Sequence, residues 1–412
     1  MVRIRAKFPH IGGRVSHEPD RRAPAASQIC YPAGGVTISP ARRTAFAVLD
    51  RVEGGAWASD LLMAAGAGLD SRDAGLASEI VFGVLRRQAQ LDFLIEHFGG
   101  ARRLDREVRL ALRMGIYQLR YLERVPPHAA VAESVELVKR ARKRSAAGMA
   151  NAVLRKVDRA PVEWPSREVE LSCPAWLLER WERNYGADAA RGIALVALEE
   201  PGKYARVSAA GTRFQDIGSQ TIVPLLELER GQTFLDLCAA PGNKTAQALE
   251  AGVRAVACDL HYHRLRALRG MAADLVVLDG TQPLPLARRF DRILVDAPCS
   301  GTGTLGRNPE IKWRLQPGDL TDLHGRQRAL LSNALAALAP GGRLVYSTCS
   351  LEPEENQDVV AEFAPGGFGP SPLPPGLAAK PGVAAVWERL PGRDAGDGFW
   401  AAVIKSDEST HG

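Results

Sequence analysis

The stretch QTFLDLCAAPGNKTAQALEAGVRAVACD, residues 232–259, decides the fold of the C-terminal half of the chain. Two short apolar runs, Phe234–Leu237 and Ala255–Cys258, flank a loop of small residues and a segment of helical composition. A strand, a tight loop, a helix and a second strand in this order predict two parallel strands joined by a crossover helix. Cys238 follows the first run and Asp259 follows the second, so both should lie at the carboxyl edge of the sheet.

Three further apolar runs follow toward the C-terminus, and each also ends in a polar or acidic residue. They are Leu275–Leu278 before Asp279, Ile293–Val295 before Asp296, and Leu344–Tyr346 before Ser347. Helical stretches separate several of them, which is typical of a doubly wound parallel sheet of the α/β class. Ligands of such sheets bind at the carboxyl ends of the strands, so we expect a ligand site where these acids collect.

Residues 39–160 have a different periodicity and predict an all-helical domain. Ser39 and Pro40 are the residue types preferred at an N-cap and at the first helical position. Apolar residues then recur at spacings of three and four, which place them on one face of a helix. The segments with this spacing are Ala45–Val52, Ile80–Leu85, Val108–Leu119, Val131–Val138 and Met149–Leu154. No strand-like alternation interrupts them, so their apolar faces should form the core of a helical domain.

The N-terminal and central segments are irregular. Residues 1–38 mix Pro, Gly, Arg and Ser without apolar periodicity and predict a flexible basic extension. Pro161 marks the start of a linker, and we expect residues 161–228 to form this linker and a small intermediate region. That region carries three apolar residues on one predicted helix face: Trp176, Leu177 and Trp181. The doubly wound domain then occupies residues 229–407.

The composition is that of an ordinary soluble protein. Of 412 residues, 46% are hydrophobic and 24% are charged, which excludes collagen-like, coiled-coil and fully disordered chains. No run approaches the roughly 20 apolar residues of a membrane-spanning helix, and the basic N-terminus lacks the apolar core of a signal peptide. We therefore expect a cytoplasmic protein without a membrane partner. Its 6 cysteines include no CxxC pair, which argues against a disulfide framework and against a zinc or other metal site.

The net charge of +6 is unevenly distributed along the chain. Residues 41–160 carry a net charge of +7, whereas residues 161–412 carry −5. The densest basic run consists of Lys139, Arg140, Arg142, Lys143 and Arg144. A polyanion such as nucleic acid would account for this concentration, although on charge alone a solvated surface is an equally ordinary explanation. The basic run shifts the balance toward RNA or DNA.

The loop after the first predicted strand is suited to binding a ligand. The run Cys238-Ala239-Ala240-Pro241-Gly242-Asn243-Lys244 consists mostly of small residues and precedes a helix, so backbone N–H groups can face a ligand. A single glycine is too few for a dinucleotide fingerprint. However, Asp259 lies where a carboxylate can accept hydrogen bonds from both ribose hydroxyls of an adenosine, and Asp279 lies near the expected adenine. Successive acids at one sheet edge favour a nucleoside-containing cofactor over isolated loop residues.

Two cysteines follow the fourth and fifth strands of the predicted sheet. The fourth strand ends in Asp296-Ala-Pro-Cys299, and the fifth ends in Tyr346-Ser-Thr-Cys349. The fourth strand of such a sheet lies beside both the first and the fifth, so both thiols should open into the crevice that holds the cofactor. A lone cysteine after a strand is most often a small buried hydrophobic residue. Two at adjacent strand ends, one with a carboxylate three residues before it, favour a chemical role.

These motifs resemble those of a known family. Residues 235–244 (LDLCAAPGNK), 296–314 (DAPCSGTGTLGRNPEIKWR) and 346–356 (YSTCSLEPEEN) resemble the cofactor loop and the two cysteine motifs of the bacterial 16S ribosomal RNA cytosine-5 methyltransferase B family. That family belongs to the NOL1/NOP2/Sun class of RNA 5-methylcytosine methyltransferases. Residues 42–157 resemble the NusB-like domain that distinguishes it. The resemblance implies a Rossmann-like S-adenosylmethionine-dependent methyltransferase domain preceded by an all-α NusB-like domain.

The resemblance also implies roles for individual residues. Cytosine C5 is a poor nucleophile, but addition of a thiolate at C6 makes an enamine whose C5 can attack the methyl sulfonium of S-adenosylmethionine. The family pattern assigns this thiolate to Cys349 and the later release step to Cys299. DNA cytosine methyltransferases use the opposite cysteine, so spacing alone does not decide between the two.

The acids and the lysine of the motifs complete the implied site. Asp296 would hold the N3 and amino edge of the base, and Lys244 would order the loop close to that carboxylate. Cofactor binding is assigned to residues 238–244 together with Asp259, Asp279 and Asp296.

The sequence departs from the family pattern at three places. Asn243 stands where the family usually has glycine, and Asn is the best-tolerated substitute if that position needs a positive φ. The spacing from Asp259 to Asp279 is shorter than the family's second crossover, so the adenine pocket is less well defined than the ribose contact. Residues 201–207 (PGKYARV) also depart from the family pattern.

We therefore predict that a monomeric protein methylates C5 of a cytidine in small-subunit rRNA and binds RNA partly through its helical domain. The same reaction on tRNA or another RNA is an alternative, although tRNA-specific relatives typically lack the helical module. A non-catalytic RNA-binding assembly factor is a second alternative, and the joint presence of Cys299, Cys349, Asp296 and Lys244 argues against it. A NAD-dependent dehydrogenase would need more glycines in the first loop.

Overall fold

The computed structural model describes residues 37–101, 103–208, 211–363, 368–370 and 386–406. Almost all of the predicted N-terminal extension lies outside these ranges. Its last residue, Ile38, is described, and its side chain is buried in the helical core. Ile38, which the sequence analysis places in the extension, therefore belongs with the helical domain, because this apolar residue packs against its core.

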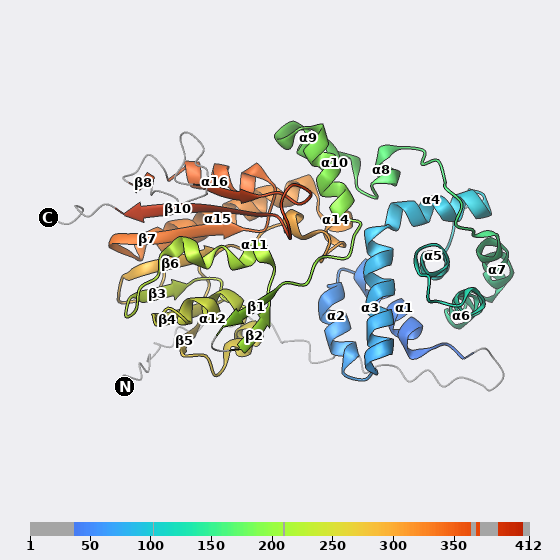
Figure 1. The fold of residues 1–412 in the computed structure, drawn as a ribbon, viewed down its shortest axis with the longest axis horizontal. Helices are drawn as coiled ribbons and strands as arrows, with labels where there is room; N and C mark the ends of the chain where they lie inside the picture. Colours follow the sequence, from blue (N-terminus) through green and yellow to red (C-terminus); the bar gives the residue numbers. More distant parts are fainter. Residues whose placement is uncertain (1–36, 102, 209–210, 364–367, 371–385, 407–412) are drawn as a thin grey trace, which may run out of the picture. The chain divides into compact units, whose positions relative to one another are not determined.

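The described residues of the N-terminal domain form helices and connecting turns, as predicted (Figure 1). The helices are α1 (Pro40–Glu53), α2 (Ala58–Gly66), α3 (Ser71–Arg86), α4 (Gln88–Gly99), α5 (Arg106–Tyr121), α6 (Pro127–Arg140), η1 (Arg144–Ala146) and α7 (Ala147–Lys156). Helix α1 begins at Pro40, but the hydroxyl of Ser39 does not cap it. Instead this hydroxyl donates to Glu133 Oε2 at 2.8 Å and so ties the start of α1 to α6.

The intermediate region contains short helices and a hairpin. Its elements are α8 (Arg167–Glu170), α9 (Ala175–Tyr185), α10 (Ala187–Val196), β1 (Ala205–Ser208), β2 (Gly211–Phe214), α11 (Ile217–Gln220) and η2 (Val223–Leu226). Leu177 and Trp181 are buried on one face of α9, as their spacing predicts. The antiparallel hairpin of β1 and β2 is not predicted by the sequence, because its strands are short and largely exposed and therefore lack an apolar face.

The C-terminal domain is built on a mostly parallel sheet with the order β5-β4-β3-β6-β7-β10-β8 (Figure 1). Its strands are β3 (Thr233–Asp236), β4 (Arg254–Asp259), β5 (Ala273–Val277), β6 (Phe290–Asp296), β7 (Leu338–Thr348), β8 (Phe368–Pro370), β9 (Val386–Arg389) and β10 (Phe399–Ser406). Strands β3 to β7 are parallel and correspond to the five predicted runs. Strand β10 is antiparallel to β7, an addition that the sequence pattern does not predict.

Helices cover both faces of this sheet, so neighbouring residues of one strand enter different cores. Leu235, Ile293 and Leu344 pack with residues of α15 (Pro317–Ala336) and α16 (Gln357–Ala361). Phe234, Leu294 and Val345, which are direct neighbours of these residues in the same strands, pack on the other face, with residues of η2 and α12 (Asn243–Leu249). Burial on both faces explains why the strands are continuous apolar runs and do not alternate between polar and apolar residues. The predicted α/β fold class is confirmed.

Candidate active site

The loop between β3 and α12 is shaped by Gly242. This residue has φ +104°, and a Cβ atom at its position would lie 2.7 Å from Leu268 Cγ, so both the conformation and the space require glycine. Asn243 is the first residue of α12 and does not have a positive φ. The departure from the family pattern at Asn243 therefore does not strain the loop, since the left-handed position is one residue earlier.

A cavity of about 80 Å³ lies at this loop. The whole run from Cys238 to Lys244 lines it, together with Ser219, Asp236 and Asp296. Asp259 is hydrogen-bonded to the loop. Its carboxylate accepts from the Ala240 amide at 3.3 Å and from the His261 amide at 2.9 Å. The structure thus brings the predicted loop residues, Asp259 and Asp296 together at one end of the sheet.

Asp279 behaves differently from Asp259. It is exposed beyond the end of β5, and its Oδ1 accepts hydrogen bonds from the amide and the hydroxyl of Thr281 at 3.0 and 2.6 Å. These hydrogen bonds lower the pKa of the Asp279 carboxyl. Neither Asp259 nor Asp279 lines the loop cavity, so the predicted cofactor contacts of both acids stay predictions.

Asp236 is a site residue that the sequence analysis does not single out. It ends β3, is fully buried, and accepts a hydrogen bond from the Thr245 hydroxyl at 2.6 Å. Its other oxygen, Oδ1, has no hydrogen-bond partner among the described residues. Burial raises the pKa of this carboxyl to about 7. In the other strands the polar or acidic residue follows the apolar run. Asp236 is instead followed by the apolar residues Leu237 and Cys238, so the sequence pattern does not mark it as a strand-end acid.

A second group of polar side chains lies at the ends of β6 and β7. Lys244 Nζ is 2.6 Å from Asp296 Oδ2, and the Ser347 hydroxyl donates to Asp296 Oδ1 at 2.8 Å. The ammonium group of Lys244 also lies 5.4 Å from the centroid of the Phe399 ring on β10. These contacts fix the Asp296 carboxylate at the carboxyl edge of the sheet, with Lys244 beside it as the sequence predicts.

The two predicted thiols meet at the same edge. The sulfur atoms of Cys299 and Cys349 are 3.3 Å apart, and the Gly303 amide donates to the Cys349 carbonyl at 2.9 Å. The hydrogen bond with Cys349, together with burial, raises the pKa of the Cys299 thiol well above its usual range. Cys299 therefore favours its protonated form in this arrangement.

A buried carboxylate joins the two cysteine loops. Glu355 Oε1 accepts hydrogen bonds from the Ser300 amide at 2.7 Å and from Gln327 Nε2 at 3.0 Å, and Glu355 Oε2 accepts from the hydroxyls of Ser300 and Ser350. Burial raises the pKa of this carboxyl. Because Ser300 and Ser350 directly follow Cys299 and Cys349, Glu355 fixes the two thiols relative to each other.

Comparisons with known proteins identify the family. A family model described as 16S rRNA methyltransferase RsmB/F matches residues 223–405, and the NusB family model matches residues 39–159. Ribosomal RNA small subunit methyltransferase B of Cronobacter sakazakii is 34% identical over 397 residues, covering 82% of this chain and 91% of the relative. The protein of the same name from Erwinia tasmaniensis is 33% identical over 413 residues, covering 86% and 95%. This chain belongs to the RsmB/F family of 16S rRNA methyltransferases.

The fold agrees with membership in the RsmB/F family. The crystal structure of the protein PH0851 superposes with a TM-score of 0.72 at 22% identity and covers 90% of this chain and 100% of that one. The predicted family resemblance and the NusB-like and Rossmann-like folds are confirmed. Within the described ranges, no helix is both long and apolar enough to cross a bilayer.

The methyl donor of this RsmB/F family member is S-adenosylmethionine, and the residues at the loop fit that molecule. Asp236 lines the cavity, and its Oδ1 has no hydrogen-bond partner among the described residues, so this carboxylate suits a cationic group of the cofactor. The absence of a side chain at Gly242 keeps the backbone accessible, and the buried acid Asp259 follows the adjacent strand β4, where a ribose is usually held. These residues would hold the cofactor next to Lys244 and Asp296.

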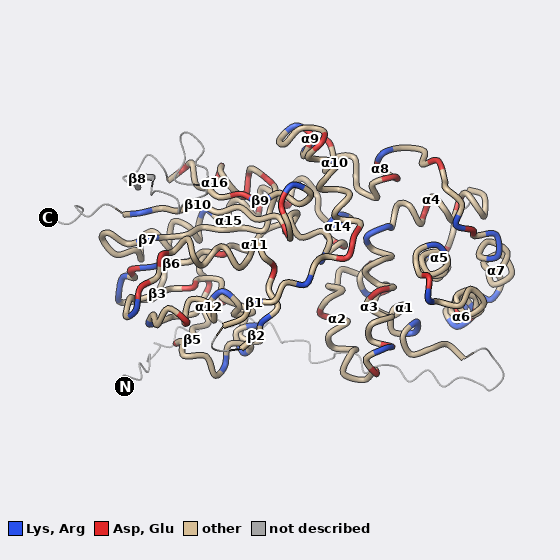
Figure 2. Tube along the Cα trace, viewed as in Figure 1, with Lys and Arg blue, Asp and Glu red and all other residues tan. Residues whose placement is uncertain are grey.

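The basic run predicted to contact RNA is only partly available in this structure. Lys139 and Arg140 lie within 3.5 Å of Glu136, and Lys143 lies 3.1 Å from Asp105. Arg142 and Arg144 are exposed, between the end of α6 and α7, where Figure 2 shows basic residues. Of the five predicted residues, these two are the best placed to meet a phosphate.

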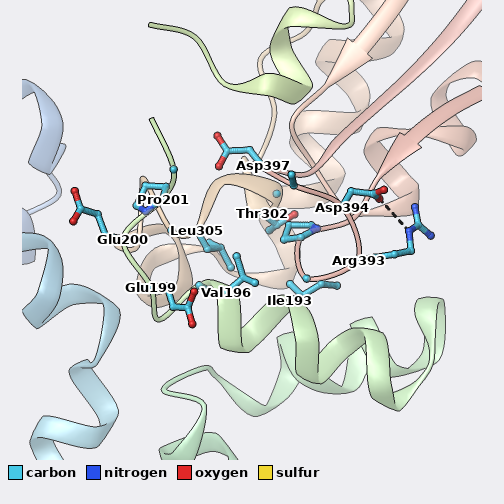
Figure 3. A pocket seen from close by; sticks show the side chains of 18 of the residues that line it. Ile193, Val196, Glu199, Glu200, Pro201, Thr302, Leu305, Arg393, Asp394 and Asp397 are labelled. Atoms are coloured by element: carbon cyan, nitrogen blue, oxygen red, sulfur yellow. Dashed lines mark hydrogen bonds and ion pairs between the residues drawn. The ribbon is translucent and has the colours of Figure 1, made fainter. Parts of the chain in front are cut away.

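A larger cavity, of about 420 Å³, lies elsewhere and contains none of the predicted site residues. It is bounded by α10, the segment after it, the turn at Thr302–Gly306 and the loop at 391–397 (Figure 3). Glu199, Glu200 and Asp397 line it, and Arg393 donates to Asp394 at 3.0 Å within it. This acidic lining is unfavourable for phosphate groups.

Proposed function

We propose that this RsmB/F family member methylates C5 of a cytidine in 16S rRNA through a transient covalent bond between Cys349 and C6 of the base. The observation that carries the proposal is the meeting of two thiols, 3.3 Å apart, with the Lys244–Asp296 pair at the carboxyl ends of adjacent strands β6 and β7. A thiolate nucleophile, a group that stabilises charge on the base, and a second sulfur for the release step are what C5 methylation needs.

In the first step, the Cys349 thiolate adds to C6, and the electron pair of the C5–C6 bond becomes available at C5. Asp296 would bind the N3 and amino edge of the cytosine, where charge changes during this addition. Lys244 and Ser347 hold that carboxylate, so it needs no reorganisation during the step. The assignment of the nucleophile to Cys349 rests on the resemblance of its Thr-Cys motif to that of the family.

In the second step, C5 acquires the methyl group that S-adenosylmethionine supplies as an electrophile, and the electron pair of the broken methyl–sulfur bond stays on sulfur as a neutral thioether. The product base is then released by elimination: the proton on C5 leaves to a base, the C6–S bond breaks, and Cys349 regains its thiolate. We assign the base to Cys299 in its deprotonated form.

The test is nucleoside analysis of methylated RNA. Purified protein, unmodified 16S rRNA transcript and S-adenosylmethionine with a labelled methyl group should yield labelled 5-methylcytidine after digestion. Parallel reactions with tRNA address the alternative substrate. Label in another nucleoside would refute the C5 assignment, and label in tRNA alone would refute the substrate. Bisulfite sequencing should show one cytidine in the rRNA that resists conversion in the wild-type strain and is converted in a strain that lacks the gene.

A further inference from the structure

A cavity of about 310 Å³ connects the catalytic loop with the helical domain. Cys299 and Ser300 line it, and so do Arg314, which ends α14 (Ile311–Arg314), and Arg326 of α15. Among the described residues, Trp57, at the N-cap of α2, is the one that the helical domain contributes to this lining, and it is the one aromatic side chain there. The site next to the thiols is therefore shared between the two domains.

The position of Trp57 is fixed by contacts that cross from one domain to the other. The following amide, that of Ala58, donates to the buried Glu310 at 2.9 Å. Arg314 Cζ lies 5.3 Å from the Trp57 ring centroid, and its guanidinium donates to the Val52 carbonyl at 2.6 Å and to the Ala56 carbonyl. Nevertheless the Trp57 side chain is 46% exposed. A large aromatic ring that is held in place but left half open has the features of a stacking surface.

We propose that Trp57 stacks on the nucleobase next to the target cytidine in the RNA. This inference rests on the proposed function and deepens it by assigning a substrate contact to the helical domain. The target base itself must reach Cys349 and Asp296, and neither of these residues lines the cavity. The cavity touches the catalytic loop at Cys299 instead, so it is placed for a neighbouring nucleotide.

The charge of the cavity supports stacking as the main attraction. Arg314 and Arg326 are balanced by Asp319 and Asp322, so the lining has no net charge to attract a phosphate strongly. Asp319 is engaged with the Gln316 amide at 2.9 Å, and Arg314 is engaged with the carbonyls of the helical domain. The indole of Trp57 offers a stacking surface beside these charged groups, and stacking on an aromatic ring accepts any base.

The test compares Trp57→Ala, Trp57→Phe and a control, Met63→Ala, in the full-length protein. Met63 lies on the same helix, is 77% exposed and does not line the cavity. We expect Trp57→Ala to raise the KM for 16S rRNA transcript about tenfold or more, with kcat and S-adenosylmethionine affinity within about twofold of wild type. Trp57→Phe should have a KM close to that of wild type, and the KM of Met63→Ala should equal that of wild type.

An abasic substitution in the RNA isolates the stacking contact. In a fragment around the mapped cytidine, removal of the flanking base should weaken binding to wild type but should not weaken binding to Trp57→Ala further. A wild-type KM for Trp57→Ala, a Phe variant no better than the Ala variant, or equal abasic effects in both proteins would overturn the proposal. If wild type makes no 5-methylcytidine, the proposed function fails separately, and filter binding of the whole transcript still tests Trp57.

Discussion

The sulfur atoms of Cys299 and Cys349 lie 3.3 Å apart although the two residues are 50 positions apart in the sequence. Parallel pairing of β6 with β7 brings the two strand ends together, and Glu355 joins the loops that follow them. The hydrogen bond between the two thiols, together with burial, raises the pKa of the Cys299 thiol. Different roles for the two sulfurs are the basis of the proposed mechanism.

Replacing Asp259 with Ala should weaken binding of S-adenosylmethionine. The change removes a carboxylate that faces the cofactor loop and is expected to accept hydrogen bonds from the ribose, a loss of roughly 1.5–3 kcal/mol. Calorimetric titration of the cofactor measures the effect, and circular dichroism checks the fold. An affinity equal to that of wild type would remove Asp259 from the site.

Asp279→Ala tests the second strand-end acid that the sequence assigns to cofactor binding. Asp279 also follows a strand of the same sheet, but its carboxylate is exposed and hydrogen-bonded to Thr281. We expect the affinity for S-adenosylmethionine to change by less than about twofold, because this exposed carboxylate already accepts two hydrogen bonds from Thr281. A large loss of affinity in the same titration would instead support the contact with adenine that the sequence predicts.

Asp236 should make cofactor binding depend on pH. Burial raises its pKa to about 7, so it is largely protonated at pH 6 and ionised at pH 8. A cationic group of S-adenosylmethionine next to its free Oδ1 would favour the ionised form. The dissociation constant should therefore fall as pH rises through this range, by up to about tenfold per unit below the pKa.

The variant Asp236→Asn separates this effect from titration of the cofactor itself. The amide keeps the size of the side chain but cannot ionise, whereas the cofactor's own amino group titrates equally with both proteins. The dissociation constant of Asp236→Asn divided by that of wild type, measured at pH 6, 7 and 8, should increase with pH. A constant ratio would mean that Asp236 does not face a cationic group of the cofactor.

The sequence predicts the parts of this site that belong to one periodic pattern. Apolar runs that end in Asp259, Asp296 or Ser347 define both the strands and the edge where the site lies, because parallel strands place their carboxyl ends together. Antiparallel β10, which brings Phe399 to Lys244, follows no comparable run-and-helix repeat. The contact of Arg314 with Trp57 joins residues 257 positions apart in different domains, and no local pattern encodes such a contact.

The exposed arginines near the end of α6 should contribute to RNA binding without base specificity. Replacing both Arg142 and Arg144 with Gln should weaken binding of 16S rRNA transcript and flatten its dependence on salt, because fewer counterions are released. Filter binding at several salt concentrations gives the slope. Arg167→Gln is the control, since Arg167 lies on α8 and pairs with Glu168 and Glu182. Identical slopes for the double variant and wild type would mean that Arg142 and Arg144 do not contact RNA phosphates.

The covalent mechanism distinguishes the two cysteines most directly. Cys349→Ala lacks the proposed nucleophile and should neither methylate RNA nor form an adduct. Cys299→Ala should methylate its RNA and then remain attached to it, because elimination requires a base for the C5 proton whereas addition does not. Both variants should retain cofactor affinity, since neither cysteine lines the loop cavity.

Denaturing electrophoresis with labelled RNA and S-adenosylmethionine measures this difference, as a protein–RNA band that survives boiling in detergent. The account predicts a strong band for Cys299→Ala and none for Cys349→Ala. A stable adduct with Cys349→Ala and none with Cys299→Ala would invert the assignment of the two thiols, and normal turnover by both variants would contradict the covalent mechanism.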